Sequence, residues 1–109
     1  MEFIHSIYDP SKPGHFVNHY LLKDIDTEEE VIDKVRQEAL RMPEGWVVGL
    51  FSRELKALAG WKVLKNNKLQ DKPLDGLSDF FQIDRITYEL IKMQDDGMRR
   101  SGNKNSRLM

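Results

Sequence analysis

The sequence contains no cysteine. Disulfide bonds, thiolate zinc sites and cysteine nucleophiles are therefore excluded, because each of them needs a cysteine sulfur. The chain also lacks any run of about 18 apolar residues, the length that a membrane-spanning helix needs, and any charged segment followed by a hydrophobic one, as in a secretory signal. These absences predict a cytoplasmic protein that does not cross a membrane.

Familiar catalytic signatures are missing as well. There is no phosphate-binding P-loop, no dinucleotide fingerprint, no HExxH metalloprotease motif and no GxSxG nucleophile elbow. Asp95 and Asp96 stand side by side, but adjacent carboxylates at a helix end are usually exposed rather than catalytic, since catalysis requires a fixed geometry. The sequence thus leans away from an enzyme and predicts no cofactor.

Charge is segregated along the chain, although the formal net charge is only −1. Residues 24–44 hold eight acidic and three basic side chains, whereas residues 53–72 hold six basic and two acidic ones. The last eleven residues hold four basic side chains and no acidic one. We expect a single folded domain over residues 1–98, followed by a flexible basic tail at residues 99–109.

An antiparallel hairpin and a helix are expected in the first part of the chain. Residues 2–8 and 16–22 have the composition of strands and flank the turn-rich segment DPSKPGH. A helix is predicted over residues 28–42, because Thr27 is a good N-cap and three glutamates fill the first helical turn.

The second part continues the pattern of an α+β fold. The apolar run 46–51 and residues 60–65 predict central strands, and residues 53–59 are compatible with either a helix or a strand. The polar segment KNNKLQDKPLDG indicates a loop. Ser78 is expected to cap a second helix, one side of which is lined by Phe80, Ile83, Thr87 and Leu90, with Ile86 and Met93 nearby. The predicted fold is a sheet of three or four antiparallel strands packed against two helices, in the order ββα-β(β)-α.

The histidines are the most obvious ligand candidates. If Tyr8 pairs with Phe16, His5 lies opposite His19, and directly opposed side chains have Cβ atoms about 5 Å apart. His15 is four residues from His19 along the strand, too far to join the pair easily. A zinc ion would need further ligands, so we expect a stacked or hydrogen-bonded histidine pair and no metal.

Neither face of the expected hairpin is cleanly polar. A sheet with one wet face alternates apolar and polar residues, and two helices in a domain of this size normally pack on one side. The second face is then covered either by a partner chain or by the central strands and the loop that begins at residue 53. We favour a small accessory, regulatory or inhibitor-type protein that binds another protein or forms a homodimer. The predicted partner-binding residues are Tyr8, Phe16 and Tyr20 on the hairpin and, on the acidic helix, Glu28, Glu29 and Asp33.

Nucleic acid is an alternative partner. Clustered lysines can bind phosphates, and an aromatic ring beside them can stack on a base. The residues that would form this surface are Trp61, Lys62, Lys65, Lys68, Lys72, Arg99 and Arg100.

One stretch also resembles a known enzyme family. WVVGLFSRELKALAGWKVL, residues 46–64, is similar to the central hairpin of the acyl-CoA-dependent N-acetyltransferase superfamily. RRSGNK, residues 99–104, resembles the pyrophosphate loop of that superfamily, except that Lys104 stands where glycine or alanine is expected. The resemblance implies a loop whose backbone amides bind the phosphates of the coenzyme, and it makes an incomplete acetyltransferase-like domain the second alternative.

Overall fold

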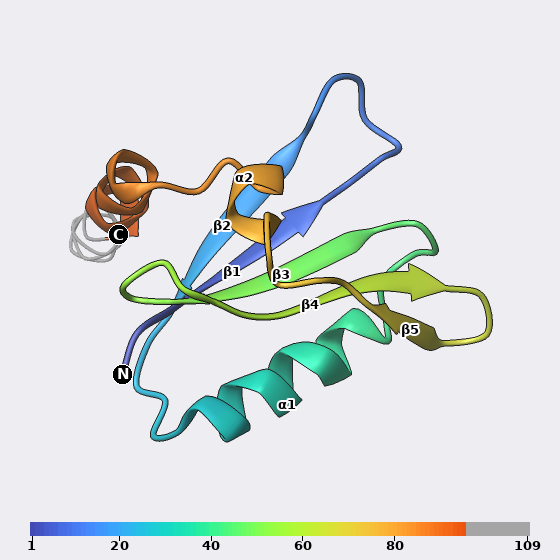
Figure 1. Cartoon of the computed structure of the whole chain (residues 1–109), viewed down its shortest axis with the longest axis horizontal. Coiled ribbons are helices and arrows are strands. Elements are labelled where there is room, and N and C mark those ends of the chain that lie inside the picture. Colours follow the sequence, from blue (N-terminus) through green and yellow to red (C-terminus); the bar gives the residue numbers. More distant parts are fainter. Residues whose placement is uncertain (96–109) are drawn as a thin grey trace, which may run out of the picture.

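A five-stranded antiparallel sheet forms the middle of the protein (Figure 1). The computed structural model describes residues 1–95. The chain runs through β1 (Phe3–Tyr8), β2 (Val17–Leu22), α1 (Glu28–Ala39), β3 (Val47–Ser52), β4 (Ala57–Leu64), β5 (Lys68–Asp71) and α2 (Leu77–Phe80), and a further helix spans residues 85–95. The strands lie side by side in the order β2-β1-β3-β4-β5. The α+β class is thus confirmed, but the predicted count of three or four strands is too low.

The hairpin of β1 and β2 has a register one residue away from the expected one. Tyr8 pairs with Val17. The N–H of Asp9 donates to the carbonyl of Phe16 (3.2 Å), so Asp9 and Phe16 close the loop directly beyond this pair. The carboxylate of Asp9 also accepts hydrogen bonds from the N–H (2.9 Å) and the hydroxyl (2.6 Å) of Ser11, which fixes the turn. A shift of one residue moves every side chain of one strand to the other face.

Helix α1 begins where its capping residue predicts. The Thr27 hydroxyl accepts a hydrogen bond from the N–H of Glu30 (3.1 Å), which satisfies a donor at the open end of the helix. The helix ends at Ala39, three residues earlier than Met42, because the chain turns before Pro43. Its buried face consists of Val31, Val35 and Ala39, which pack on the sheet with Phe3, Val48, Leu50 and Trp61.

Strand β5 lies in a segment that was predicted to be a loop. Asn66 and Asn67 both have positive φ angles, 63° and 57°, which is the conformation of a tight hairpin turn. This turn pairs β5 with β4, although Leu69 is the only apolar side chain in β5. Of residues 53–59, which the sequence makes compatible with either a helix or a strand, 53–56 form the turn that joins β3 to β4 and 57–59 belong to β4.

The prediction of one continuous helix that begins at Ser78 is wrong, because the chain breaks it in two. Helix α2 ends at Phe80, and Gln82 has a φ angle of 55°, which a continuous helix does not allow. The next helix restarts at residue 85, where the Asp84 carboxylate accepts a hydrogen bond from the N–H of Thr87 (2.8 Å). Asp84 is therefore the helix cap in this segment.

Helical segments cover both faces of the sheet, contrary to the expectation that two helices pack on one side. Helix α1 lies below the sheet in Figure 1 and α2 above it. A second buried cluster on the α2 side joins the sheet to the end of the described chain; it contains Ile4, Val47, Phe51, Leu77, Phe81, Ile83 and Tyr88. The second face of the hairpin, to which Tyr8, Val17 and Leu21 contribute, packs against this cluster.

A pair of glycines makes the second layer possible. Gly49 and Gly60 lie opposite each other in β3 and β4. A Cβ atom at position 49 would lie 2.5 Å from Cε2 of Phe81, and one at position 60 would lie 2.8 Å from Cδ2 of Leu77. The missing side chains leave a depression in the sheet, and Phe81 and Leu77 fill it.

Gly49→Ala is expected to lower the free energy of unfolding by about 1–3 kcal/mol, because the new methyl group overpacks the contact with the rigid Phe81 ring. Gly60→Ala should cost less, since the Leu77 side chain can rotate away. Both losses are measured by urea denaturation.

Combining Gly49→Ala with Phe81→Leu should relieve the clash. The double variant is therefore expected to lose less free energy of unfolding than the sum of the losses of the two single variants. Phe16→Leu, which changes a ring in the loop of the hairpin, is the matched control and should be additive with Gly49→Ala. Additivity with Phe81→Leu as well would contradict the contact.

Candidate functional site

The helix at residues 85–95 carries a row of exposed apolar side chains. Ile86 is 72% exposed, Leu90 54% and Met93 67%. Their spacing of four and three residues places them on one face of the helix, and we call these three residues the apolar stripe. Large apolar side chains that gather on a surface mark interaction sites in many soluble proteins.

The opposite face of the same helix holds it against the sheet. Tyr88 is buried and its hydroxyl donates a hydrogen bond to Oε1 of Glu2 (3.0 Å), while Ile91 packs against the core. Nζ of Lys23 lies 2.7 Å from Oδ2 of Asp95, which ties the end of the helix to the segment after β2. The apolar stripe is therefore presented on a helix that is anchored by its other side.

The sequence predicts one long helix with Leu90 on its apolar side and Ile86 and Met93 nearby. The helix break at Gln82 and the new cap at Asp84 rotate the sequence so that Tyr88 and Ile91 point inward instead. The signal that was overlooked is Asp84, since aspartate is a favoured N-cap residue whose carboxylate can accept from the backbone N–H three residues on.

The predicted partner-binding aromatic residues do not form one surface. The Tyr8 ring stacks on His15 (4.8 Å between ring centroids) and meets Phe80 edge-on (5.3 Å), so the chain itself covers this ring. His15 also donates from Nε2 to the carbonyl oxygen of Phe80 (2.6 Å), which joins the hairpin loop to the end of α2. The Phe16 ring is half-buried, with Nζ of Lys12 4.4 Å from its centroid.

Tyr20 and the acidic residues lie elsewhere. Tyr20 is 48% exposed and stands on the α1 side of the sheet, whereas Tyr8 is on the α2 side. Glu28, Glu29 and Asp33 are exposed on α1. Of the predicted partner-binding residues, Tyr20 and these three carboxylates are the ones exposed on the α1 side.

His5 and His19 are separated by the corrected register. His5 lies opposite Tyr20 and faces α1, while His19 lies opposite Ser6, and its Nδ1 is hydrogen-bonded to the Ser6 hydroxyl (2.7 Å) on the other face. The two imidazoles therefore cannot hold one ion between them. Within residues 1–95 no group of three or more histidine, aspartate or glutamate side chains is placed to hold a metal.

His5 is buried beside an open hollow. Its side chain is 4% exposed, and its Nε2 has no hydrogen-bond partner among residues 1–95. Oε2 of Glu38, on α1, lies 3.9 Å from Nδ1. Burial lowers the pKa of His5 from 6.5 to about 4, because an imidazolium cation loses its hydration there. The ring is neutral at pH 7.

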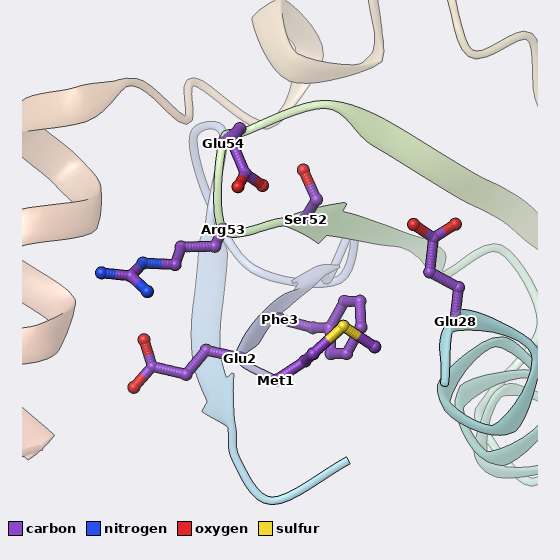
Figure 2. Close-up of a pocket in the computed structure, with 7 residues that line it drawn as sticks. All are labelled: Met1, Glu2, Phe3, Glu28, Ser52, Arg53 and Glu54. Atoms are coloured by element: carbon purple, nitrogen blue, oxygen red, sulfur yellow. The ribbon is translucent and has the colours of Figure 1, made fainter. Parts of the chain in front are cut away.

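A second hollow, of about 210 Å³, opens where β1 begins (Figure 2). The side chains of Arg53 and Glu2 extend to the same side of this pocket, and Glu28 stands on its other side, on α1. The Ser52 hydroxyl accepts a hydrogen bond from the N–H of Lys56 (3.1 Å), and no histidine lines the pocket to act as its base. The serine in this pocket is thus without the histidine that often activates such a hydroxyl, and the carboxylates that line the pocket are those of Glu2, Glu28 and Glu54.

The candidate nucleic-acid surface is divided. Trp61 is 5% exposed and packs in the core beneath α1, so its ring is not available for stacking on a base. Lys62 and Lys68 are exposed on the α2 side of the sheet, and Lys72 follows on the same side. Lys65 is exposed in the β4–β5 turn. Arg99 and Arg100 lie outside the described residues.

The resemblance to N-acetyltransferases can be compared with the structure only in the central hairpin. The β3–β4 hairpin exists, as the resemblance to N-acetyltransferases implies, but RRSGNK lies outside the described residues. No helix within residues 1–95 is long and apolar enough to cross a membrane. Comparisons with models of protein families, with curated proteins and with solved structures found no match for the chain.

The stability of the protein is expected to fall as the pH drops from 6.5 to about 4. In this window the unfolded chain binds a proton at His5 and the folded chain does not, so protonation favours unfolding. Once the pH is below both pKa values of His5, its protonation has lowered the free energy of unfolding by about 3 kcal/mol. The lowered pKa of His19 acts in the same direction.

Urea denaturation at pH 7.0 and pH 4.5 measures this loss. His5→Gln should reduce the difference between the two pH values, because it removes the buried titrating ring. Equal differences in the wild type and in His5→Gln would show that the burial of His5 is not its cause.

Proposed function

We propose that the protein is a non-catalytic protein-binding module that docks on a partner chain through the apolar stripe. The observation that carries this proposal is the exposure of Ile86, Leu90 and Met93 on one face of an anchored helix. Residues at such spacing form the apolar face with which amphipathic helices enter a groove or pair with another helix.

The polar neighbours of the apolar stripe fit a protein partner. Arg85 and Glu89 flank it on one side, with Nη1 of Arg85 4.0 Å from Oε1 of Glu89, and both side chains are more than half exposed. An apolar centre with a charged rim is the usual composition of a protein–protein interface. The guanidinium carbon of Arg85 also lies over the ring of Tyr88, 5.4 Å from its centroid, at the edge of the anchored face of the helix.

The acidic surface of α1 supports a role in association rather than in the contact itself. Glu28, Glu29 and Asp33 are exposed on the side of the sheet opposite α2. Their charge raises the rate at which a basic partner approaches, an effect that decreases as salt is added. The acidic helix then guides the partner, and the apolar stripe binds it.

Replacing the apolar stripe with serine (Ile86→Ser, Leu90→Ser, Met93→Ser) is expected to abolish partner binding without lowering the melting temperature, because all three side chains are exposed in the free protein. Sedimentation velocity over a range of concentrations shows whether the partner is a second copy. A photo-crosslinking amino acid at position 90, used in cells of the source organism, identifies a different partner.

The matched control for crosslinking is the same amino acid at position 33, on α1. Specific binding gives a product from position 90 that the Ile86→Ser, Met93→Ser background loses, while position 33 gives no such product. The proposal fails if the wild-type protein sediments as a monomer at all concentrations and position 90 gives no product of its own. A large drop in melting temperature would instead assign the apolar stripe to the core.

Binding to nucleic acid remains a second candidate because Lys62 and Lys68 are exposed on one side of the β4–β5 hairpin, with Lys65 in its turn. With Trp61 buried, such binding would be mainly electrostatic and would not depend on stacking.

Under this alternative, the protein is retained on heparin at low salt, and Lys62→Gln, Lys65→Gln, Lys68→Gln lowers the salt concentration of elution. The control is Lys12→Gln, Lys34→Gln, Arg36→Gln, which removes the same charge elsewhere and should elute close to the wild type. Elution of both triple variants at one salt concentration would exclude a local phosphate-binding surface.

A further inference from the structure

A hollow of about 270 Å³ opens on the α1 side of the sheet, away from the apolar stripe. Helix α1 packs mainly across β3 and β4, so the part of this face that β1 and β2 form lies beside the helix. The residues around the hollow are His5, Ile7, Tyr20, Leu22, Glu38 and Met42. Four of them provide apolar or aromatic walls, and the polar groups are an imidazole and a carboxylate.

The imidazole of His5 is the unusual member of this set. A buried polar atom without a hydrogen bond costs free energy, yet Nε2 has no partner among residues 1–95. Because the carboxylate of Glu38 lies near Nδ1, the proton of the neutral ring is favoured on Nδ1. Nε2 then carries a lone pair that can accept a hydrogen bond from a ligand.

The walls define the rest of the ligand. The Tyr20 ring stands 6.2 Å from the His5 ring at an angle of 51°, and it is half-exposed, so it can move to admit a planar group. A dry apolar cavity of about 150 Å³ is large enough for benzene, and this hollow is larger. An aromatic ring therefore fits its size and its lining.

We propose that this hollow binds a small aromatic molecule that carries an N–H or O–H donor, with its ring between Tyr20 and Met42 and its donor on Nε2 of His5. Glu38 is a positioning residue in this site, because it selects the tautomer of His5. The site does not depend on partner binding at the apolar stripe, since it lies on the other face of the sheet.

The test is a two-dimensional NMR titration of the full chain with indole and, as a matched ligand, 1-methylindole, which has the same rings but no N–H. Indole should shift the resonances of Ile7, Tyr20, Leu22 and Met42. It should also change the ¹⁵N shift of His5 Nε2, and 1-methylindole should bind roughly threefold to tenfold more weakly, because it cannot form the hydrogen bond.

His5→Phe is expected to remove the difference between the two ligands while keeping the apolar walls. If this variant does not fold, the ¹⁵N shifts of His5 in the wild type decide the matter, since they report both the tautomer and the new hydrogen bond. Glu38→Gln should reduce the preference for indole, and Glu29→Gln, also on α1, should not. The proposal is overturned if indole shifts none of these resonances, or if 1-methylindole binds as tightly as indole.

Discussion

The contact between a glycine depression in the sheet and the two apolar side chains that fill it determines the architecture of this protein. Gly49 and Gly60 remove two side chains from the middle of the α2 face, and Phe81 and Leu77 occupy their place. Phe81 in turn meets Phe51 edge-on, with ring centroids 5.9 Å apart. The end of the described chain is thereby held on the sheet, and the rest of the second layer follows from this contact.

The same contact explains how the surface is divided. Once Phe81 and Leu77 are seated, Ile83 and Tyr88 complete the buried cluster, and the helix at residues 85–95 must turn its remaining apolar side chains outward. The α1 side of the sheet is built differently, because a single helix covers only part of it. The apolar stripe is therefore exposed to solvent on the α2 side, and the α1 side has an open hollow beside the buried His5.

Local signals in the sequence predicted the parts of the fold that depend on local physics. Thr27 capped α1 as expected, and the apolar run before Ser52 became the central strand. The failures came from features that depend on tertiary contacts. Nothing in the composition of the hairpin distinguishes pairing of Tyr8 with Phe16 from pairing with Val17, yet this one-residue difference separates His5 from His19.

The position of the apolar stripe could not be predicted from the sequence for the same reason, because it depends on a tertiary contact. A stripe at positions 86, 90 and 93 and a stripe at positions 81, 88 and 91 both have helical spacing, so periodicity alone cannot choose between them. The depression at Gly49, which accepts Phe81, makes the choice, and it involves residues more than thirty positions apart in the sequence. Of the aromatic residues predicted to bind a partner, Tyr8 packs within the chain against His15, Phe80 and the second cluster, while Tyr20 stays exposed on the other face.

The position of Phe81 in the chain has a consequence for how the protein is made. Synthesis proceeds from the N-terminus, so all five strands leave the ribosome before the residues that cover their second face. During that interval Ile4, Val47 and Phe51 face water on an otherwise complete sheet. While residues 77–95 are still to be synthesised, the nascent sheet is therefore exposed to association with other chains, and the seating of Phe81 in the glycine depression ends that exposure.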